Sequence, residues 1–219
     1  NTLGYYKKVT CIPIGYKKEE LNSSKGIPNS IKASIPNNKF TIGYFGGLGI
    51  SNALDPFFNV VCKFRKNHDI HFLVAGSGDL KNKYALQTNN LKNITMFPLI
   101  EKKFINSIIK KCDLLYFSTH DSEIWKYGQS LNKLVEYMLS GKPIIGSYNG
   151  YETMINESNC GEFLKPYDEI AIKEAILKYK NMNHNERKEI GLRGKKWILK
   201  HRSYNKIGED LASLIYSLF

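Results

Sequence analysis

Phe40-Thr41-Ile42-Gly43-Tyr44-Phe45-Gly46-Gly47-Leu48-Gly49 is a nearly continuous apolar run that ends in a glycine-rich turn. Such a run is typical of a strand that is covered on both faces in a parallel sheet. Asp55 and Pro56 follow, with an apolar stripe over residues 54–62, which predicts a helix capped by Asp55 and begun by a first-turn proline. A buried strand, a glycine turn and a helix in this order predict an α/β fold.

The alternation of short apolar runs and striped helical segments continues on both sides of this stretch. The predicted strands are residues 9–14, 40–45, 70–75, 94–99, 114–118 and 143–147. Helices with apolar stripes are predicted over residues 54–62, 104–109 and 131–139. Parallel strands need such crossover helices, so the expected fold is a Rossmann-like, doubly wound parallel sheet in a single domain, residues 1–219.

The segments outside the sheet are predicted from caps and local composition. After residue 147 the strand pattern fades, and the remaining chain is expected to be mainly helical, with Asp168 and Ser203 as helix caps. Gly141 is expected to end the helix that precedes the last predicted strand. Residues 22–38 are rich in Ser, Pro, Asn and Lys, have no period and are predicted to form a surface loop.

The composition is that of a globular protein with an excess of positive charge. Hydrophobic residues make up 42% of the 219 residues and charged residues 24%, which excludes a disordered tail or a fibre. Lys and Arg number 32 against 20 Asp and Glu, which gives a net charge of +12. A positive field attracts phosphates, nucleic acids or an anionic membrane surface. The net charge therefore predicts a negatively charged partner and leaves the identity of that partner open.

The cysteines bear on the compartment. Cys11, Cys62, Cys112 and Cys160 each lie in or beside an apolar run, and there is no Cys-x-x-Cys pair, so buried reduced thiols are expected rather than metal ligands. Reduced thiols favour a cytoplasmic protein. No apolar run approaches the ~20 residues that a membrane-spanning helix needs. The chain begins at Asn1 without a Met, which suggests a fragment or a processed product.

Two strand-to-helix turns are rich in glycine. In an open parallel sheet, ligands bind beyond the carboxyl ends of the strands, where helix starts present free N–H groups. In the first turn Gly46, Gly47 and Gly49 let the backbone approach a phosphate closely, although a tight turn alone also explains them. The second turn, residues 76–79, suits either a ligand or a plain helix start. Neither turn has the spacing of a dinucleotide fingerprint or of a P-loop.

A third turn opens the run Tyr127-Gly128-Gln129-Ser130-Leu131-Asn132-Lys133-Leu134-Val135-Glu136-Tyr137-Met138. Ser130 is expected to cap a helix, so an anion at the helix start would meet backbone N–H groups and the cation of Lys133 beside Asn132. Glu136, one turn beyond Asn132, is placed to accept hydrogen bonds from vicinal hydroxyls such as those of a ribose. This chemistry suits a nucleotide, and an exposed ion pair between Lys133 and Glu136 is the alternative.

This run, followed by Gly-Lys-Pro-Ile-Ile at residues 141–145, resembles the donor-site motif of retaining glycosyltransferases of the GT-B fold, family 4. Tyr-Gly-x-Ser-x-Asn-Lys-Leu-x-Glu-Tyr-Met is similar to the version in bacterial enzymes that build O-antigen, capsule or related surface polysaccharides. The motifs Phe-Gly-Gly-Leu-Gly at 45–49, Leu-Val-Ala-Gly-Ser-Gly at 73–78, Asn-Ile-Thr-Met-Phe at 93–97 and Cys-Asp-Leu-Leu at 112–115 stand in the order and spacing of such enzymes. The resemblance covers nearly the whole chain.

The resemblance implies that residues 1–219 are the C-terminal, donor-binding domain of a two-domain enzyme whose N-terminal domain is missing. Residues 1–16 would be a strand arriving from that domain, and residues 203–219 a helix crossing back onto it. Glu136 would hold the ribose, and the backbone near residues 99 and 100 would meet the base. The implied donor contacts are Gly46, Gly47, Gly49, Leu99, Ile100, Gly128, Ser130, Asn132, Lys133 and Glu136.

The implied reaction moves a hexose or N-acetylhexosamine from a UDP-sugar to a lipid-linked or growing surface-glycan acceptor, with retention at the anomeric carbon. Lys133 and Glu136 are the implied catalytic residues. The acceptor would bind mainly to the missing domain, so this chain alone is expected to be inactive. No Asp-x-Asp motif occurs, and neither a metal nor another cofactor is expected. A nucleotide or sugar-phosphate binding module without transferase chemistry is the alternative. The sequence leaves open the sugar, the nucleotide, the acceptor, the linkage and the oligomeric state.

The sequence departs from the family pattern at two places. Many members have a Glu eight positions before the ribose-binding Glu, where this chain has Gly128. The Arg and Lys that usually follow the first strand are replaced by uncharged residues over 46–52. Lys133, with Lys126 as a further candidate, would therefore have to balance the diphosphate. Whether Asp121 or Glu123 replaces the missing Glu is left open.

Other polar residues have two interpretations each. His120, with Asp121 and Glu123, either faces the donor sugar or lies in a solvated loop. Trp125 either stacks on a sugar or base or anchors its loop in the core. His68 and His71 lack a third ligand in the sequence, so a metal site is not expected there.

The basic residues of the last helices also have two interpretations. They are Arg187, Lys188, Arg193, Lys195, Lys196, Lys200 and Arg202. Either they form a solvated helix face, or they hold the protein peripherally on the anionic inner face of a bacterial plasma membrane. Specific nucleic-acid binding is not expected, because basic residues are not interleaved with exposed aromatics and no recognised module occurs.

Overall fold

The computed structural model describes residues 11–19, 26–98 and 100–217 of the chain. Its strands are all parallel and form one six-stranded sheet in the order β3-β2-β1-β4-β5-β6. The strands are β1 (Phe40–Phe45), β2 (Ile70–Ala75), β3 (Ile94–Met96), β4 (Leu114–Ser118), β5 (Ile144–Ser147) and β6 (Gly161–Leu164). The strand order reverses between β1 and β4, which is the arrangement of a doubly wound sheet, and the predicted Rossmann-like α/β fold is confirmed.

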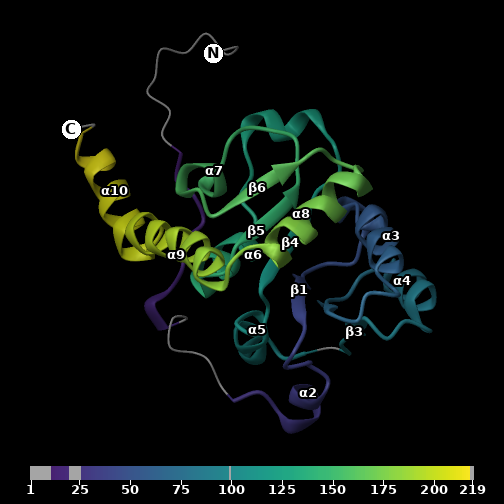
Figure 1. Ribbon diagram of the computed structural model, residues 1–219. Helices are drawn as coiled ribbons and strands as arrows, with labels where there is room; N and C mark the ends of the chain where they lie inside the picture. Colours follow the sequence, from purple (N-terminus) through teal and green to yellow (C-terminus); the bar gives the residue numbers. More distant parts are fainter. Residues whose placement is uncertain (1–10, 20–25, 99, 218–219) are drawn as a thin grey trace.

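Helices cover both faces of this sheet (Figure 1). They are α2 (Asn29–Ala33), α3 (Asp55–Lys63), α4 (Lys81–Thr88), α5 (Lys102–Ile109), α6 (Asn132–Ser140), α7 (Met154–Ser158), α8 (Glu169–Asn181), α9 (His184–His201) and α10 (Tyr204–Tyr216), with 3-10 turns at Ile50–Asn52 and Glu123–Tyr127. α3 packs with α4 and α8, whereas α6 packs with α5 and α9. α10 extends away from the sheet (Figure 1). None of the described helices is long and apolar enough to span a bilayer.

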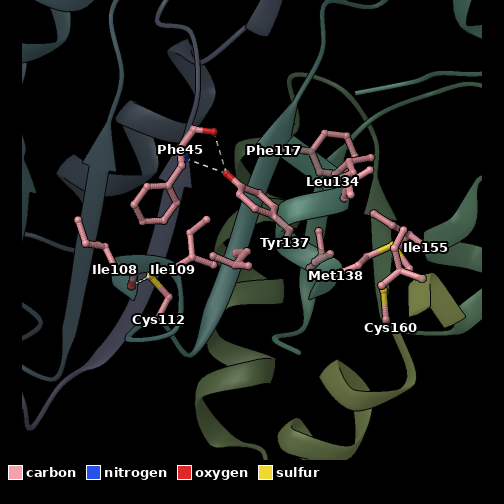
Figure 2. Close-up of a cluster of buried hydrophobic side chains, with 14 of the residues drawn as sticks. Phe45, Ile108, Ile109, Cys112, Phe117, Leu134, Tyr137, Met138, Ile155 and Cys160 are labelled. Atoms are coloured by element: carbon pink, nitrogen blue, oxygen red, sulfur yellow. Dashed lines mark hydrogen bonds between the residues drawn. The ribbon is translucent and has the colours of Figure 1, made fainter. Parts of the chain in front are cut away.

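Alternation along the strands builds two hydrophobic cores, one under each helical layer. In β4, Leu114 and Tyr116 belong to the core beneath α3 and α8, whereas Leu115 and Phe117 belong to the core beneath α5, α6 and α9. Figure 2 shows the second core, with Tyr137 of α6 at its centre. Because both faces are covered, every residue of β1, β2, β4 and β5 is buried. This double burial explains the continuous apolar runs of the sequence.

The predicted strands differ from the observed ones mainly at the edges of the sheet. β1, β2 and β4 begin and end as predicted, β3 stops at Met96, and β5 begins at Ile144. The expectation of a mainly helical chain after residue 147 is confirmed by α7, α8, α9 and α10, but it missed one strand, because Gly161–Leu164 forms β6 beside β5. β6 is a half-buried edge strand of four residues that includes a glutamate, so its sequence lacks the apolar run that marks the central strands.

The first part of the chain also differs from the prediction. Of the predicted strand 9–14, residues 9 and 10 lie outside the described residues, and 11–14 form no strand. Tyr16 makes an isolated parallel bridge with Ser203 instead. The predicted loop 22–38 contains the helix α2 among its described residues.

The predicted burial of the cysteines is correct for two of them. Cys112 and Cys160 are buried in the core of Figure 2, whereas Cys62 is half-buried and Cys11 is exposed. The prediction is wrong for Cys11, because its segment runs along the surface and not through the sheet.

Helix ends follow three of the five predicted caps. Asp168 accepts a hydrogen bond from the Ala171 N–H at 2.9 Å. Ser203 accepts one from the Lys206 N–H at 3.2 Å. Gly141 ends α6 in the left-handed region, with φ of 71°, where glycine is favoured.

The predicted Asp55 cap is wrong. Leu54 is the N-cap of α3, and Asp55 is its first residue. The Asp55 carboxylate pairs with Lys83 Nζ at 2.7 Å, so it links α3 to α4. The Lys83 ammonium holds the pKa of Asp55 below its ordinary value.

Candidate functional site

A pocket of about 390 Å³ opens at the carboxyl edge of the sheet, beyond β1 and β2 and beside the start of α6. Its lining residues are Phe45, Gly46, Ala75, Gly76, Ser77, Ile100, Lys102, Ile105, Leu131, Asn132, Lys133 and Glu136. This position, next to the reversal of strand order, is where open α/β sheets bind ligands. The volume suits a small molecule.

The structure gathers part of the predicted site in this pocket. Gly46, Ile100, Asn132, Lys133 and Glu136 line it. Three separate segments of the chain supply them: the turn after β1, the start of α6 and the segment before α5. The sequence motifs that suggested a nucleotide therefore meet at one place.

The other predicted contacts lie elsewhere. Gly47, Gly49, Gly128 and Ser130 are outside the lining of the pocket, and Leu99 lies outside the described residues. The predicted Ser130 cap is wrong, because α6 begins at Asn132 and its N-cap is Leu131. No side chain caps this helix start in the described structure, so its first N–H groups remain available to an anion.

Lys133 is the cation of the pocket, and it is half-buried rather than exposed. Its ammonium donates to Asn52 Oδ1 at 2.8 Å and to the Tyr44 hydroxyl at 3.3 Å. It also lies 4.9 Å from the centroid of the Tyr44 ring. Burial disfavours the charged amine and lowers its pKa to about 8.

Tyr137, one turn after Lys133, fixes α6 against the end of β1. The Phe45 N–H donates to the Tyr137 oxygen at 2.8 Å, and the Tyr137 hydroxyl donates to the Phe45 carbonyl at 3.3 Å (Figure 2). Both groups are buried, so these bonds are sheltered from water. The start of α6 is thus held beside Gly46.

The two glycine turns interlock beside Lys133. The Leu48 N–H donates to the Ser77 carbonyl at 2.7 Å, which extends the pairing of β1 and β2 into their turns. A Cβ at Gly46 would lie 2.9 Å from Lys133 Nζ, and a Cβ at Gly76 would lie 1.8 Å from the Gly46 carbonyl oxygen. Only glycine allows the backbone approach at Gly76, whereas a side chain at Gly46 would displace the Lys133 ammonium. The second turn therefore belongs to the site, although its sequence was equally compatible with a plain helix start.

Glu136 lines the pocket near the start of α5. Its carboxylate is 3.9 Å from Lys102 Nζ. Lys102 is the first residue of α5, and sequence reasoning missed it together with Ile105 and Leu131. The signal that could have found Lys102 is its place two residues after Ile100, in the segment that the resemblance assigned to the base.

Lys126 does not reach the pocket. It is exposed and pairs with Glu123 within the 3-10 turn Glu123–Tyr127. Trp125 anchors its loop, because it packs against the core and its indole N–H donates to the His120 carbonyl at 2.6 Å. Of the two interpretations of Trp125, the structure shows the anchor.

His71 and His68 lie in different surroundings. His71 is buried, and its Nε2 lies 2.9 Å from Thr95 Oγ1. Burial, with the nearby charge of Lys39, lowers the pKa of His71 to about 4, so its ring is neutral. His68 is exposed. Within the described residues, no group of three or more His, Cys, Asp or Glu side chains is arranged to hold a metal ion.

Comparisons with solved structures show a shared fold. A glycosyltransferase from Rickettsia africae superposes with a TM-score of 0.70 at 15% identity over 93% of this chain and 55% of that chain. Anabaena Alr3699/HepE in complex with UDP and glucose gives the same score, identity and shares. A mutant of S. aureus TarM in complex with fondaparinux, alpha-GlcNAc-glycerol and UDP gives 0.67 at 18% identity over 81% of this chain and 36% of that chain. The chain thus spans about a third to just over half of these proteins.

A family comparison gives the assignment. No curated protein matches the chain. Residues 39–181, which include the whole of the pocket lining, match the family described as Glycosyl transferases group 1. Because this match covers more than half of the 219 residues, and the sheet is that of GT-B glycosyltransferases, the chain belongs to the family of group 1 glycosyl transferases.

Proposed function

We propose that the chain is the C-terminal, donor-binding half of a retaining glycosyltransferase of family 4 that uses a UDP-sugar. The observation that carries the proposal is the pocket at the sheet edge, where Lys133 and Glu136 stand one turn apart on α6 beside Gly46. A nucleoside diphosphate has the two groups that such an arrangement recognises, a diphosphate and a vicinal diol. Anabaena HepE and S. aureus TarM were crystallised with UDP, which supports the choice of uridine.

Each part of the donor has a partner of suitable chemistry in the pocket. The diphosphate would accept hydrogen bonds from Lys133 Nζ and from the uncapped N–H groups at the start of α6. Glu136 would accept hydrogen bonds from the ribose hydroxyls. The base would lie against the segment of Ile100 and the apolar side of Ile105.

The chemistry of this half is stabilisation of the leaving group. When the bond between the anomeric carbon and the diphosphate breaks, negative charge grows on the phosphate oxygen that departs. Lys133 and the N-terminal end of α6 would face that charge, and stabilising it by about 3 kcal/mol would raise the rate roughly a hundredfold. The proposed transfer needs no metal or other cofactor, so a chelator should leave turnover of the complete enzyme unchanged.

The complete enzyme would move a hexose or an N-acetylhexosamine to a lipid-linked or growing surface glycan, as in bacterial O-antigen synthesis. The missing N-terminal half would bind most of the acceptor, and the isolated chain would be inactive. Residues 1–16 would arrive from that half, and α10 would cross back onto it. Leu211 and Ile215 of α10 are partly exposed apolar residues, as expected of a helix that lacks its partner.

Calorimetric titration with UDP, GDP and a panel of UDP- and GDP-sugars tests the donor site. We expect UDP to bind, Lys133→Ala to lose about tenfold or more in affinity, and Glu136→Gln to lose binding mainly for nucleotides with both ribose hydroxyls. Lys110→Ala is the matched control, because Lys110 is exposed and outside the pocket lining. Absence of binding to every nucleotide would overturn the donor assignment.

The alternative is a nucleotide or sugar-phosphate binding module without transferase chemistry. It is favoured by Gly128, which stands where many members have a Glu and lies outside the pocket lining. Transfer assays with the full-length parent protein separate the two functions. UDP binding without any sugar transfer by that parent would support the binding module, whereas transfer that is lost with Lys133→Ala would support the enzyme.

A further inference from the structure

A second cavity, of about 320 Å³, lies on the other half of the carboxyl edge, beyond β4 and β5. Its lining includes Asp121, Glu123, Lys126, Asn149, Gly150 and Tyr151. None of these residues lines the pocket beside α6. The carboxyl edge therefore has two hollows, one beyond β1 and β2 and one beyond β4 and β5.

Trp125 connects, through hydrogen bonds, the loop after β4 and the loop after β5, which together form this cavity. Its carbonyl accepts hydrogen bonds from the Tyr151 N–H at 2.9 Å, the Gly128 N–H at 3.1 Å and the Tyr148 hydroxyl at 3.2 Å. Its indole N–H donates to the His120 carbonyl. One residue of the loop after β4 thus fixes both its own loop and the loop after β5.

Close packing beneath the cavity leaves these loops little freedom. The Tyr148 ring lies 4.9 Å from the Phe163 ring, centroid to centroid. A Cβ at Gly150 would lie 2.5 Å from the Trp125 carbonyl oxygen and from the Tyr148 hydroxyl, so only glycine fits. A site whose walls are fixed in advance binds its ligand with a smaller loss of entropy.

The loop after β6 joins the same assembly. The Asp121 N–H donates to the Tyr167 hydroxyl at 3.2 Å, and that hydroxyl also bonds the His120 ring. Tyr167 has a φ of 64°, a conformation that non-glycine residues rarely adopt. Strained backbone held in place by surrounding contacts is frequent at binding sites.

The outer side of this assembly exposes large apolar side chains. Tyr151, which lines the cavity, is 65% exposed, and the neighbouring Ile124 and Tyr127 are 64% and 91% exposed. Trp125 and Tyr148 already fill the core below, so these three side chains have no structural role in it. An exposed tyrosine beside fixed polar groups combines an apolar face with hydrogen-bonding partners.

The chemistry of the lining selects a ligand class. A pyranose ring has an apolar face that packs on an aromatic ring, and a rim of hydroxyls that donate to carboxylates and amides. Tyr151 offers the ring, and Asp121, Glu123 and Asn149 offer the acceptors. Lys126 neutralises Glu123, with which it pairs, and the carboxylate of Asp121 leaves the lining with a net negative charge, which disfavours a phosphate.

We propose that the cavity between the loops after β4 and β5 binds a sugar ring of the acceptor glycan, with Tyr151 packed against the ring and Asp121 and Asn149 bonded to its hydroxyls. The proposal rests on the proposed function, because an acceptor is meaningful only for a transferase. It places part of the acceptor site on the donor half. A neutral sugar would then bind here independently of UDP.

Titration of the isotopically labelled chain with chitotriose, maltotriose and cellotriose, followed by amide NMR, tests this site. We expect at least one trisaccharide to shift amide signals of residues 119–128 and 148–152. Tyr151→Ala should weaken that trisaccharide about three- to tenfold, which is the loss of one aromatic packing contact. Asn149→Ala, a change of an exposed polar side chain, should weaken it as well. Both variants should bind UDP like the wild type.

Tyr216→Ala is the matched control, because Tyr216 is a 79% exposed tyrosine of α10. The proposal is overturned if no trisaccharide shifts the two loops, or if Tyr151→Ala binds like the wild type, or if Tyr216→Ala weakens binding equally. The two proposals fail separately. UDP binding without any saccharide binding would remove only the acceptor site, whereas saccharide binding at Tyr151 without UDP binding would remove the donor assignment and leave a sugar site.

Discussion

Lys133 is a half-buried amine whose partners in the described structure are neutral: an amide oxygen, a hydroxyl and a ring. The amide oxygen and the hydroxyl accept hydrogen bonds from the ammonium, but none of the three groups carries a negative charge that would offset its positive charge. Burial lowers the pKa of Lys133 to about 8, and these neutral partners do not offset the effect. A diphosphate would supply the missing negative charge, so ligand binding and protonation of Lys133 should be coupled.

UDP affinity should therefore fall as the pH rises through 8, the pKa of free Lys133. Below pH 8 the Lys133 amine is already charged, so UDP binding needs no proton. Because a bound diphosphate raises the pKa of Lys133, UDP binding above pH 8 must take up a proton from solution. The UDP affinity then falls by up to about tenfold per pH unit. UDP itself loses its last phosphate proton near pH 6, so its charge stays constant over this range. Titration calorimetry at a series of pH values measures the slope. Lys133→Arg, whose side chain stays charged, should show none.

Gly76 illustrates a contact that no side chain can replace. Its position leaves 1.8 Å between a hypothetical Cβ and the Gly46 carbonyl oxygen, so Gly76→Ala must push the two turns apart. We expect a loss of about 1–3 kcal/mol in the free energy of unfolding. UDP affinity should fall with it, because Gly46 moves. Urea denaturation measures the first effect.

Gly49→Ala is the comparison for that stability measurement. Gly49 has an extended backbone, with φ of −121°, and nothing lies within 4 Å of its hypothetical Cβ. Its substitution should change the free energy of unfolding by less than about 0.5 kcal/mol. Equal destabilisation by both substitutions would contradict the interlocking of the turns.

At the scale of elements, the sequence predicts the strands that are buried on both faces of the sheet. β1, β2 and β4 are apolar at every position because a helical layer covers each face, and their bounds follow from the sequence. β6 is at the edge, with Glu162 pairing to Lys178 at 3.0 Å, so its sequence resembles a polar loop. Strand pairing, rather than local composition, makes it a strand.

The sequence predicts helix starts from residue type, but the backbone conformation determines where each helix begins. Ser130 has the preferred chemistry of a cap, but the chain remains extended through Leu131 before α6 begins. The same limit applies to the site. Sequence spacing within one helix placed Lys133 and Glu136 in the pocket, whereas Lys102 comes from another helix that only the sheet topology brings near.

The correctly predicted cap Asp168 and the wrongly predicted cap Ser130 can be compared by their effects on stability. Asp168→Ala should lower the free energy of unfolding by about 0.5–2 kcal/mol, because the Ala171 N–H at the start of α8 loses its acceptor. Ser130→Ala should change it by less than about 0.5 kcal/mol, because Ser130 is exposed and caps nothing in the described structure. Thermal or urea denaturation of the two variants measures both values. A comparable loss from Ser130→Ala would show that α6 begins earlier than Asn132.

For the whole molecule, the net charge of +12 is not explained by the pocket, which contains two lysines, Lys102 and Lys133. Much of the remainder lies on the helical layer of α9. Arg193, Lys196 and Lys200 are exposed and follow one another at helical spacing along α9. A stripe of this kind either is solvated or faces an anionic surface.

We expect the stripe to bind vesicles that contain phosphatidylserine, and not vesicles of phosphatidylcholine alone, with binding that falls as salt rises. Changing Arg193, Lys196 and Lys200 together to Gln should remove about 1 kcal/mol per charge, which is roughly a hundredfold in partitioning measured by co-sedimentation. The matched control changes three exposed basic residues on the side of α3 and α4, namely Arg65, Lys66 and Lys92, to Gln. If both triple variants lost the same vesicle affinity, the net charge of the whole protein, and not the stripe on α9, would attract the membrane. Both variants lose the same total charge, so they differ in affinity only if one face of the protein is turned toward the membrane.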